Sequence, residues 1–505
     1  MTRDERLLRT GVAGLDDILN GGLAEGHVFL IEGSPGTGKT TIALSFLLEG
    51  GRQGETGLYI ALSETEQELR MGARSHGWEI GPATTVFELV PPESLLDADQ
   101  QQSLLYSSDL ELGETTRVIL EAFERIRPAR VVLDSLSEIR LLAQSSLRYR
   151  RQLLALKHYF SQSGSTVLLL DDMTAETADK TVHSVVHGVI HLEKLTPEYG
   201  ADRRRARIVK YRGSDFRGGY HDMKIQRGGV EVYPRLVAQE HRTDFDRSLM
   251  TSGIPAFDAL LGGGIEQGSS TLVLGPAGAG KTLIALQFLM AAIARGGKAA
   301  MFVFDEELGL LVKRVASLGI DLAGGIARGA LHVEQLDAAE LSPGEFAHRV
   351  RRHVTETGAR TVAIDSLNGY QAAMPEENSL ILHMHELLQF LNRQGATTFL
   401  TVAQHGLVGD MKAPVDITYL ADSVILLRYF EALGKMRRAV SVIKKRTGPH
   451  EDTIREYRIG AGGLTIGAPL EDFQGVLATP REAPPEDGTT VPPPTSTLPP
   501  AAPEC

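Results

Sequence analysis

The octapeptide Gly33-Ser34-Pro35-Gly36-Thr37-Gly38-Lys39-Thr40 decides the fold of this chain, and it recurs as Gly275-Pro276-Ala277-Gly278-Ala279-Gly280-Lys281-Thr282. Both stretches match G-x-x-x-x-G-K-[ST], and equivalent residues lie 242 positions apart (Lys281 − Lys39 = 242). The glycines of this motif let backbone N–H groups surround phosphate oxygens, and the helix that follows adds the positive end of its dipole. The chain is therefore predicted to contain two nucleotide sites.

Each motif has the surroundings that a phosphate loop requires, an apolar strand before it and a helix after it. The strands are expected at His27–Glu32 and Ser270–Leu274, and the helices at Thr41–Leu48 and Leu283–Ile293. A chance glycine-rich turn is the alternative, and finding the same surroundings twice argues against it. The lysine of each motif is expected to reach the β- and γ-phosphates, and the closing threonine to bind Mg²⁺.

The two motifs belong to a longer repeat. Residues 10–47 align without a gap to residues 252–289, with 17 of 38 positions identical, which indicates duplication. Apolar runs then alternate with helical patterns, as in an α/β fold with a mostly parallel sheet flanked by helices. These strands are expected at Leu58–Leu62, Arg130–Leu133, Thr166–Leu170 and Gly188–Leu192, and at Ala299–Phe304, Thr361–Ile364, Thr397–Val402 and Ser423–Leu427.

Both repeats are predicted to close with a β-rich segment, and three regions follow from the composition. The polar stretch EHRTDFDRS at 240–248 separates a first domain, 1–243, from a second, 244–475. Residues 476–505 are rich in proline and poor in large apolar side chains, so a disordered tail is predicted. The closing strands are expected at Arg207–Tyr211, Gly218–Gln226 and Val230–Tyr233, and at Ala439–Lys445 and Asp452–Ile459.

The composition indicates a soluble, cytoplasmic protein. The 505 residues are 42% hydrophobic and 23% charged, and the net charge of −12 argues against a nucleic-acid or membrane partner. Arg203–Arg205 and Arg437–Arg438 are interpreted as hairpin turns with solvated charge rather than as nucleic-acid patches. The single cysteine, Cys505, fits a reducing compartment. The first residues lack an apolar h-region and no apolar run reaches about 18 residues, so neither a secretory signal nor a membrane span is expected.

An apolar strand ends in Asp-Ser in each repeat, at Asp134 and at Asp365. A carboxylate at the carboxyl edge of a parallel sheet is where the second magnesium-holding group of this class of site belongs. The alternative is an aspartate that caps the following turn. We predict the metal role because a phosphate loop lies upstream in both cases.

A second strand in each repeat ends in acidic residues, Glu64 in the first and Asp305 with Glu306 in the second. Since Glu306 − Glu64 = 242, the two glutamates are equivalent. Either could act as the general base for an attacking water or hydroxyl. The alternative is helix capping, for which Ser63 and Glu66 have the spacing of a capping box.

The closing strands contain Lys210-Tyr211-Arg212 and Lys444-Lys445-Arg446. Side chains alternate along a strand, so the cations at the first and third positions of each triplet share one face. We predict that they act as an arginine-finger pair on the phosphate of a neighbouring subunit. A solvated basic edge is the alternative, and the recurrence in both repeats favours the functional interpretation.

Together these residues resemble the KaiC family, the double-domain ATPases and autokinases of the cyanobacterial circadian clock and their wider bacterial relatives. The resemblance spans about residues 1–475. It rests on the opening T-G-x-x-x-L-D-x-x-x-x-G-G, both phosphate loops, both Asp-Ser strands, and the segments 63–65 (SET), 73–78 (ARSHGW), 210–214 (KYRGS), 422–427 (DSVILL) and 444–446 (KKR). It implies two tandem RecA-like domains, a homo-hexameric double ring with ATP and Mg²⁺ between subunits, and a regulatory protein partner.

The resemblance also assigns residues to each site. The first nucleotide site would comprise Gly33, Gly36, Thr37, Gly38, Lys39, Thr40, Thr41 and Ser75, with Lys210, Tyr211, Arg212 and Ser214 from the neighbour. The second would comprise Gly275, Ala277, Gly278, Ala279, Gly280, Lys281, Thr282, Leu283 and Leu318, with Lys444, Lys445 and Arg446 from the neighbour. The catalytic residues would be Glu64, Asp305, Glu306, Arg212 and Arg446, and the metal ligands Thr40, Asp134, Thr282, Asp305 and Asp365.

The sequence departs from the family at three places. Ser63 and Asp305 each replace the first of two adjacent glutamates, and Tyr419 replaces a threonine at the autophosphorylation segment, which leaves Thr418 as the candidate phosphate acceptor. An ordinary loop residue is the alternative for Thr418. We expect an ATP-hydrolysing hexameric signalling protein with Ser/Thr autokinase activity in the second domain. The alternatives are a RecA-like DNA-dependent ATPase and an ATP-gated assembly scaffold.

Overall fold

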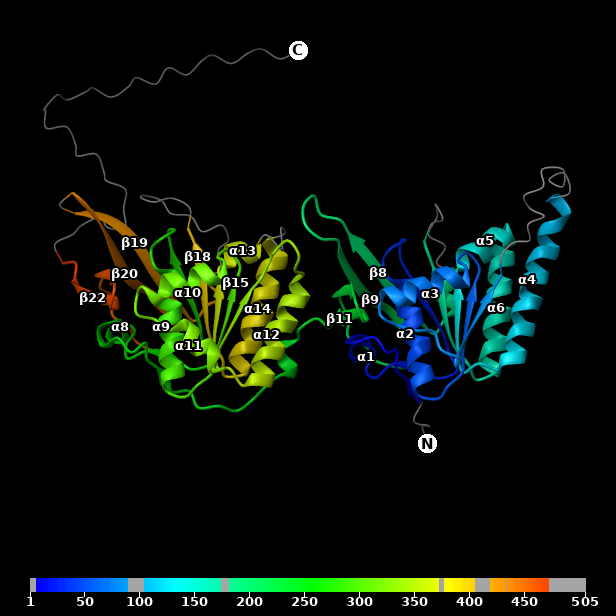
Figure 1. Ribbon diagram of the computed structural model, residues 1–505, viewed down its shortest axis with the longest axis horizontal. Helices are drawn as coiled ribbons and strands as arrows, with labels where there is room; N and C mark the ends of the chain where they lie inside the picture. Colours follow the sequence, from blue (N-terminus) through cyan, green and yellow to red (C-terminus); the bar gives the residue numbers. More distant parts are fainter. Residues whose placement is uncertain are drawn as a thin grey trace, which may run out of the picture.

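The computed structural model describes residues 6–89, 104–173, 181–371, 377–404, 418–432 and 434–471, and the predicted tail at 476–505 lies outside these ranges. Two α/β domains follow one another along the long axis of the molecule (Figure 1). Each is built on a nine-stranded sheet with helices on its faces. Within the described ranges, no helix is long and apolar enough to cross a membrane.

The sheet of the first domain has the strand order β11-β10-β9-β8-β3-β7-β6-β4-β5. Strands β8 to β5 in this order are parallel, and β9, β10 and β11 are antiparallel. The elements of this domain are β1 (Leu7–Leu8), α1 (Leu15–Ile18), β2 (Leu23–Ala24), β3 (Val28–Glu32), α2 (Lys39–Arg52), β4 (Gly57–Ala61), α3 (Glu66–Ser75), β5 (Thr84–Glu88), α4 (Leu104–Ile126), β6 (Arg130–Asp134), α5 (Leu136–Ala143), α6 (Ser146–Gln162), β7 (Thr166–Asp171), α7 (Thr181–Val185), β8 (Gly188–Leu195), β9 (Arg203–Tyr211), β10 (His221–Gln226) and β11 (Gly229–Tyr233).

The sheet of the second domain has the order β16-β15-β17-β18-β14-β19-β20-β21-β22. Read from β22 to β16, it matches the strand order of the first domain at every position. A short 3₁₀ turn, Ala238–Glu240, connects the domains. The elements of this domain are β12 (Leu249–Met250), α8 (Pro255–Leu260), β13 (Ile265–Glu266), β14 (Ser270–Gly275), α9 (Lys281–Ala294), β15 (Ala299–Val303), α10 (Leu308–Ala316), α11 (Leu322–Ala327), β16 (Leu331–Gln335), α12 (Pro343–Thr357), β17 (Thr361–Asp365), α13 (Leu367–Gln371), α14 (Glu377–Arg393), β18 (Thr397–Ala403), β19 (Ser423–Ala432), β20 (Lys435–Lys445), β21 (Arg455–Gly460) and β22 (Gly463–Pro469).

The prediction of two tandem RecA-like α/β domains is confirmed. Every strand expected from the apolar runs is present, with ends that differ by a few residues. The prediction missed the edge strands β5, β16 and β22 and the two-stranded sheets β1–β2 and β12–β13. Edge strands are covered on fewer sides, so their sequences lack the continuous apolar character of central strands. In β5 only the first residue is fully buried.

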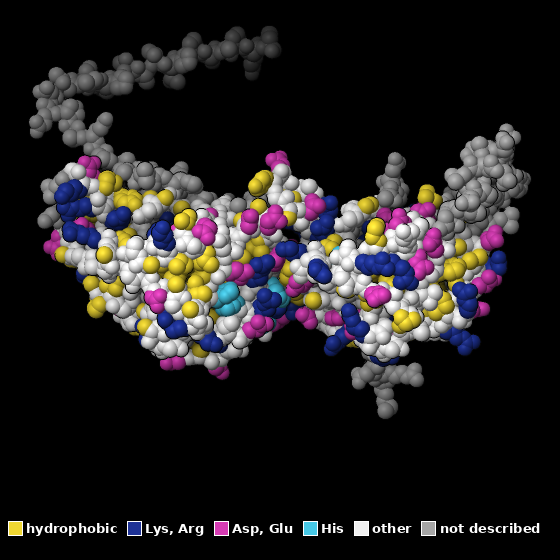
Figure 2. Space-filling model, viewed as in Figure 1, with side chains coloured by type: hydrophobic (Ala, Val, Ile, Leu, Met, Phe, Trp, Pro, Cys, Tyr) yellow, Lys and Arg dark blue, Asp and Glu magenta, His cyan; other side chains and the backbone are white. Residues whose placement is uncertain are grey.

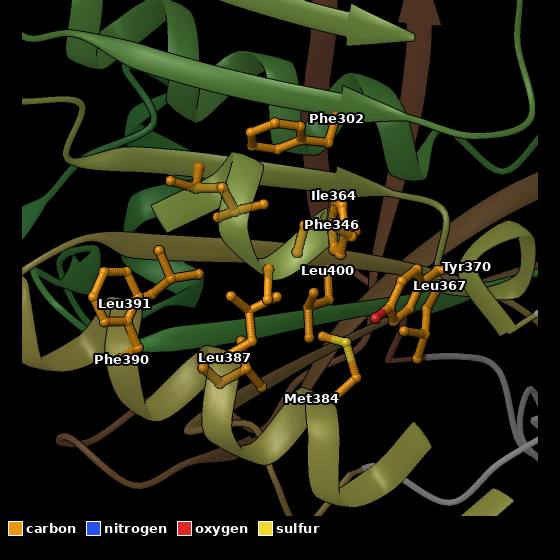
Figure 3. Close-up of a cluster of buried hydrophobic side chains, with 14 of the residues drawn as sticks. Phe302, Phe346, Ile364, Leu367, Tyr370, Met384, Leu387, Phe390, Leu391 and Leu400 are labelled. Carbon is orange, nitrogen blue, oxygen red and sulfur yellow. The ribbon is translucent and has the colours of Figure 1, made fainter. Parts of the chain in front are cut away.

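The core of the second domain shows what holds the sheet in place. Phe302, Ile364 and Leu400 lie on three neighbouring strands and meet Phe346 of α12 and Leu387 of α14 (Figure 3). All five side chains are 1% exposed or less. Burying a side chain of this size contributes about 1.5–3 kcal/mol. The carboxyl ends of the strands, where the predicted site residues lie, are therefore supported by a rigid layer.

Strand β10 joins the two domains. Its Asp222 accepts a hydrogen bond from the backbone N of Gly344 at 2.6 Å, at the start of α12. Its Lys224 forms an ion pair with Glu345 at 3.2 Å. Ile225, which points to the opposite face of the strand, lies against Gly38 in the first phosphate loop. One strand thus contacts both the first phosphate loop and the second domain.

The two arginine runs are not in hairpin turns, and that interpretation is wrong. Arg203–Arg205 lie within β9, and Arg437–Arg438 lie within β20. Their charges are partly paired, since Arg205 forms an ion pair with Glu193 at 2.7 Å. Figure 2 shows basic and acidic side chains interspersed over both domains on the face drawn.

Candidate functional site

The two phosphate loops have the same backbone geometry. Each begins at the end of a central strand and runs into a helix whose first residue is the lysine. Gly38 and Gly280 precede these helices with φ of 104° and 98°, which L side chains rarely adopt. A Cβ would also lie 2.9 Å from Ile225 at the first position and 2.7 Å from Ile459 at the second. Both turns therefore require glycine.

The loop lysines are held at the centre of each loop. Lys39 Nζ donates to the carbonyl of Gly33 at 2.7 Å and forms an ion pair with Asp172 Oδ1 at 2.8 Å. Lys281 Nζ donates to the carbonyls of Gly275 and Pro276 at 3.0 and 2.9 Å. Burial lowers the pKa of Lys281. A phosphate group would replace these internal partners of the ammonium groups.

In the first domain the structure brings the loop threonine and the strand-end aspartate together. Thr40 Oγ1 lies 3.4 Å from Asp134 Oδ2, and the hydroxyl of Tyr59 donates to the same oxygen at 2.5 Å. Burial is the largest cause of the raised pKa of Asp134, which the Tyr59 hydrogen bond opposes. The peptide bond between Asp134 and Ser135 is cis.

The second domain repeats this pair. Asp365 accepts hydrogen bonds from Thr282 and from Thr401, a residue of the neighbouring strand β18. Burial again raises the pKa of the carboxyl group. The peptide bond between Asp365 and Ser366 is also cis. The two candidate metal positions are thus equivalent in position, with different hydrogen-bonding neighbours.

A hydroxyl beside a carboxylate suits Mg²⁺, which prefers oxygen ligands and keeps several positions for water and substrate phosphates. Within the described ranges there is no group of three or more His, Cys, Asp or Glu residues that could hold a metal ion alone. The pairs Thr40 with Asp134 and Thr282 with Asp365 therefore fit an ion that is shared with a nucleotide.

Glu64 lies at an open cavity of about 390 Å³ beside the first phosphate loop, lined also by Thr40, Gly72 and His76. The residue as a whole is exposed, but its carboxyl group is enclosed enough that burial raises its pKa. The negative charge of Asp134 is the next largest cause. A raised pKa brings a glutamate closer to the value that suits a general base near neutral pH.

The equivalent acids of the second domain are both engaged. Arg314 donates Nε to Glu306 Oε1 at 2.9 Å and Nη2 to Oε2 at 2.7 Å. Ser366 Oγ donates to Asp305. This arrangement has no counterpart at Glu64 within the described part of the chain.

The proposed capping box at Ser63 and Glu66 is wrong. The residues that cap α3 are Thr65 and Glu68, whose side chains and backbone N–H groups bond reciprocally. Glu307 caps α10 by accepting from two backbone N–H groups. Glu64 lies outside the cap, so the capping alternative does not account for it.

Several assigned residues have side chains occupied elsewhere. Thr37 Oγ1 donates to the carbonyl of Ser34, and Ser75 Oγ donates to that of Gly72. Leu283 is 1% exposed in the core, so only its main chain could meet a nucleotide. Leu318 follows the end of α10 and packs partly against the same core. Thr41 lines the cavity beside Glu64.

The cations of the closing strands are held by main-chain carbonyls of their own domain. Lys210 Nζ donates to Val186 at 2.8 Å and Arg212 to Ser184 at 2.8 Å, just before β8. The second domain repeats this before β19. There Lys444 Nζ donates to the carbonyls of Thr418 at 2.8 Å and Ala421 at 2.7 Å, and Arg446 donates to the carbonyl of Tyr419 at 2.9 Å.

Strand register separates these cations from the phosphate loop of the same domain. Tyr211 pairs with Gly188, and Gly188 pairs with Phe29 near the beginning of β3, whereas the loop follows the end of β3. The hydroxyl of Tyr211 is buried on the backbone of Gly22 and Ala24.

The remaining residues of these segments also have partners nearby. Ser214 Oγ donates to the carbonyl of Asp215, and Lys445 Nζ donates to that of Leu261. The structure therefore does not bring the closing-strand residues to the phosphate loop of their own domain.

Sequence reasoning missed three residues of the sites, Asp172, Tyr59 and Arg314. Asp172 directly follows the end of β7, so the rule that sites gather at the carboxyl ends of parallel strands could have found it. No comparable signal marks Tyr59 or Arg314. Both act through a partner that is distant or out of helical phase in the sequence.

Comparison with known proteins gives a consistent result. The family model described as the KaiC ATPase matches residues 8–237 and 250–471. The chain is 28% identical over 480 residues to circadian clock protein KaiC3 of Synechocystis sp., covering 93% of this chain and 94% of that protein. It is 27% identical over 474 residues to the circadian clock oscillator protein KaiC of Thermostichus vulcanus, covering 93% of this chain and 90% of that protein.

Proposed function

Since the chain belongs to the KaiC family of ATPases, we propose that it binds ATP with Mg²⁺ at both phosphate loops and hydrolyses it as a ring-forming signalling protein. The observation that supports this most is the repeated geometry of lysine, threonine and aspartate. Lys39 with Thr40 and Asp134, and Lys281 with Thr282 and Asp365, occupy equivalent places on two sheets of the same topology.

At the first site the proposed roles follow from the contacts. Lys39 exchanges Asp172 for the β- and γ-phosphates, and Thr40 and Asp134 hold the ion. Mg²⁺ supplies neutralisation of the phosphate charge when it is bound. Glu64 takes the proton of the attacking water, for which its raised pKa is suitable.

We further propose that Lys210 and Arg212 complete the site of a neighbouring subunit in a homo-hexamer. They lie near the amino-terminal end of β3, whereas their own phosphate loop follows its carboxyl-terminal end, and this separation supports a role in trans. Such a ring would be a cytoplasmic particle to which a regulatory protein binds.

The test of the ATPase is phosphate release by Lys39→Ala, by Lys281→Ala and by the double variant, with Lys298→Ala as an exposed control. We expect the double variant to lose activity and the control to keep it. Persistence of activity in the double variant would refute the proposal.

The test of the ring uses two inactive chains, both with Lys281→Ala. One also has Lys39→Ala and the other Arg212→Ala. Mixed rings should regain phosphate release, because an intact loop then meets an intact cation from its neighbour. Size-exclusion chromatography with ATP should show a particle of six times the monomer mass. No recovery in mixed rings of that size would refute action in trans.

A second activity, autophosphorylation in the second domain, is favoured by one contact. Lys444, expected to face a neighbour's nucleotide, donates to the carbonyl of Thr418. In this reaction Thr418 Oγ bonds to the γ-phosphorus, the bond to ADP breaks, and the hydroxyl proton passes to a carboxylate. Incubation with γ-labelled ATP should label a peptide containing Thr418, and the label should be absent in Thr418→Val. Label elsewhere, or none, would refute this assignment.

A further inference from the structure

The two sites differ at one pair of equivalent positions next to the proposed bases. Gly72 lies on α3 and Arg314 lies on α10, and Arg314 − Gly72 = 242, the same spacing that relates Glu64 to Glu306. The helices have matching buried positions, because Leu69 and Leu311 both point into the core. The side chain at this position therefore faces the glutamate in one domain and is missing in the other.

In the second domain both carboxylate oxygens of Glu306 accept from the guanidinium group of Arg314, at 2.9 and 2.7 Å. A two-pronged bond of this kind fixes the orientation of the carboxylate as well as binding its charge. The arginine is 45% exposed and the glutamate 28%. Ion pairs at such exposure are weak, so this contact can open without disturbing the fold.

In the first domain Gly72 leaves the same region open as part of the 390 Å³ cavity that Glu64 lines. Within the described ranges, no side chain donates a hydrogen bond to Glu64. A Cβ built at Gly72 meets no atom within 4 Å. The position therefore has room for a side chain, and glycine is not required there by packing.

We propose that Arg314 is a positioning residue that holds Glu306 away from its role as base, so that the second site retains ATP while the first hydrolyses it. The proposal rests on the proposed ATPase function. The guanidinium group holds both oxygens of Glu306 toward α10 and neutralises their charge, which lowers their tendency to accept the proton of the attacking group. Opening of this contact is the event that would make the second site active.

The test separates the sites and moves the arginine between them. In the Lys39→Ala background, which leaves only the second site, Arg314→Gly should raise the turnover number about twofold to fivefold, the range that release of a partly exposed ion pair allows. Adding Glu306→Gln should remove the gain. In the Lys281→Ala background, Gly72→Arg should lower turnover at the first site by a similar factor and leave ATP affinity nearly unchanged.

Lys313→Gly is the matched control, because it removes an exposed cation and introduces the same glycine into α10. It should leave turnover unchanged. The Lys39→Ala chain should still bind one ATP, measured by equilibrium dialysis. Unchanged turnover in Arg314→Gly, a gain that survives Glu306→Gln, or no ATP bound to Lys39→Ala would each overturn the proposal. Activity that persists in the double lysine variant would instead overturn the ATPase function itself.

Discussion

Asp172 competes with ATP for the loop lysine, and we predict that Asp172→Asn tightens ATP binding at the first site. The carboxylate lies 2.8 Å from Lys39 Nζ, in the place where a phosphate oxygen would approach. Binding of ATP must break this ion pair and bring more negative charge beside Asp172. Asparagine keeps the size of the side chain and removes both obstacles.

The magnitude follows from exposure. The Lys39 side chain is 6% exposed and that of Asp172 is 30% exposed. Exposed pairs contribute about 0.2–1 kcal/mol, and the buried lysine places this one near the upper end, at about 1 kcal/mol. Because 1.4 kcal/mol corresponds to a factor of ten in affinity, the dissociation constant should fall about fivefold.

The assay is titration with a fluorescent ATP analogue in the Lys281→Ala background, so that only the first site is counted. Glu121→Gln is the control, since it removes one negative charge from an exposed pair with Arg117 on α4. It should not change the affinity. An unchanged or weaker affinity in Asp172→Asn would refute the reasoning. Weaker binding only when Mg²⁺ is present would show that Asp172 acts as a metal ligand.

Three further predictions concern stability. His221 accepts from the backbone N of Arg235 through Nδ1, and burial lowers its pKa to about 4. The unfolded chain therefore binds more protons between pH 6.5 and 4, so stability should fall by up to about 3 kcal/mol as pH drops through that window, and His221→Gln should flatten this part of the unfolding curve. Arg130→Ala should lower the free energy of unfolding, measured by chemical denaturation, by about 3–5 kcal/mol, because Arg130 is fully buried and pairs with Glu55. Asp222→Ala removes an acceptor at the start of α12 and should lower the melting temperature with a loss of about 1 kcal/mol, while cleavage by protease between the domains becomes faster.

The fold could be predicted because its determinants are contiguous in the sequence. The phosphate loops fix a strand and a helix on either side, and the central strands are apolar runs such as Val28–Glu32, with all five residues buried. Edge strands were missed where burial alternates or is partial, as in Thr84–Glu88. The prediction places Arg203–Arg205 in a turn because consecutive charges favour one. In the structure they lie within β9, where Arg205 forms an ion pair with Glu193 of the neighbouring strand β8.

The site could be predicted only as far as single motifs reach. Lys39, Thr40 and Asp134 follow from local patterns, but Asp172 reaches Lys39 because β7 pairs with β3 in a register that places Asp171 opposite Glu32. No pattern within one segment contains that register. Glu306 and Arg314 are eight residues apart, and Glu306 lies in the bend before α10 rather than in the helix, so helical spacing does not bring them together.

The two sites differ in what must be displaced before they can act. In the first, Asp172 forms an ion pair with Lys39, and the phosphates of the incoming nucleotide can replace its carboxylate. In the second, Ala403 stands where Asp172 stands in the first, as the pairing of Leu274 with Val402 and of Glu32 with Asp171 requires. There Arg314 forms an ion pair with the carboxylate of Glu306. Phosphates bound to the loop are anions and cannot replace the arginine as the partner of Glu306. Binding of ATP would therefore prepare the first site for hydrolysis by itself, whereas the second would need a separate event that draws Arg314 away.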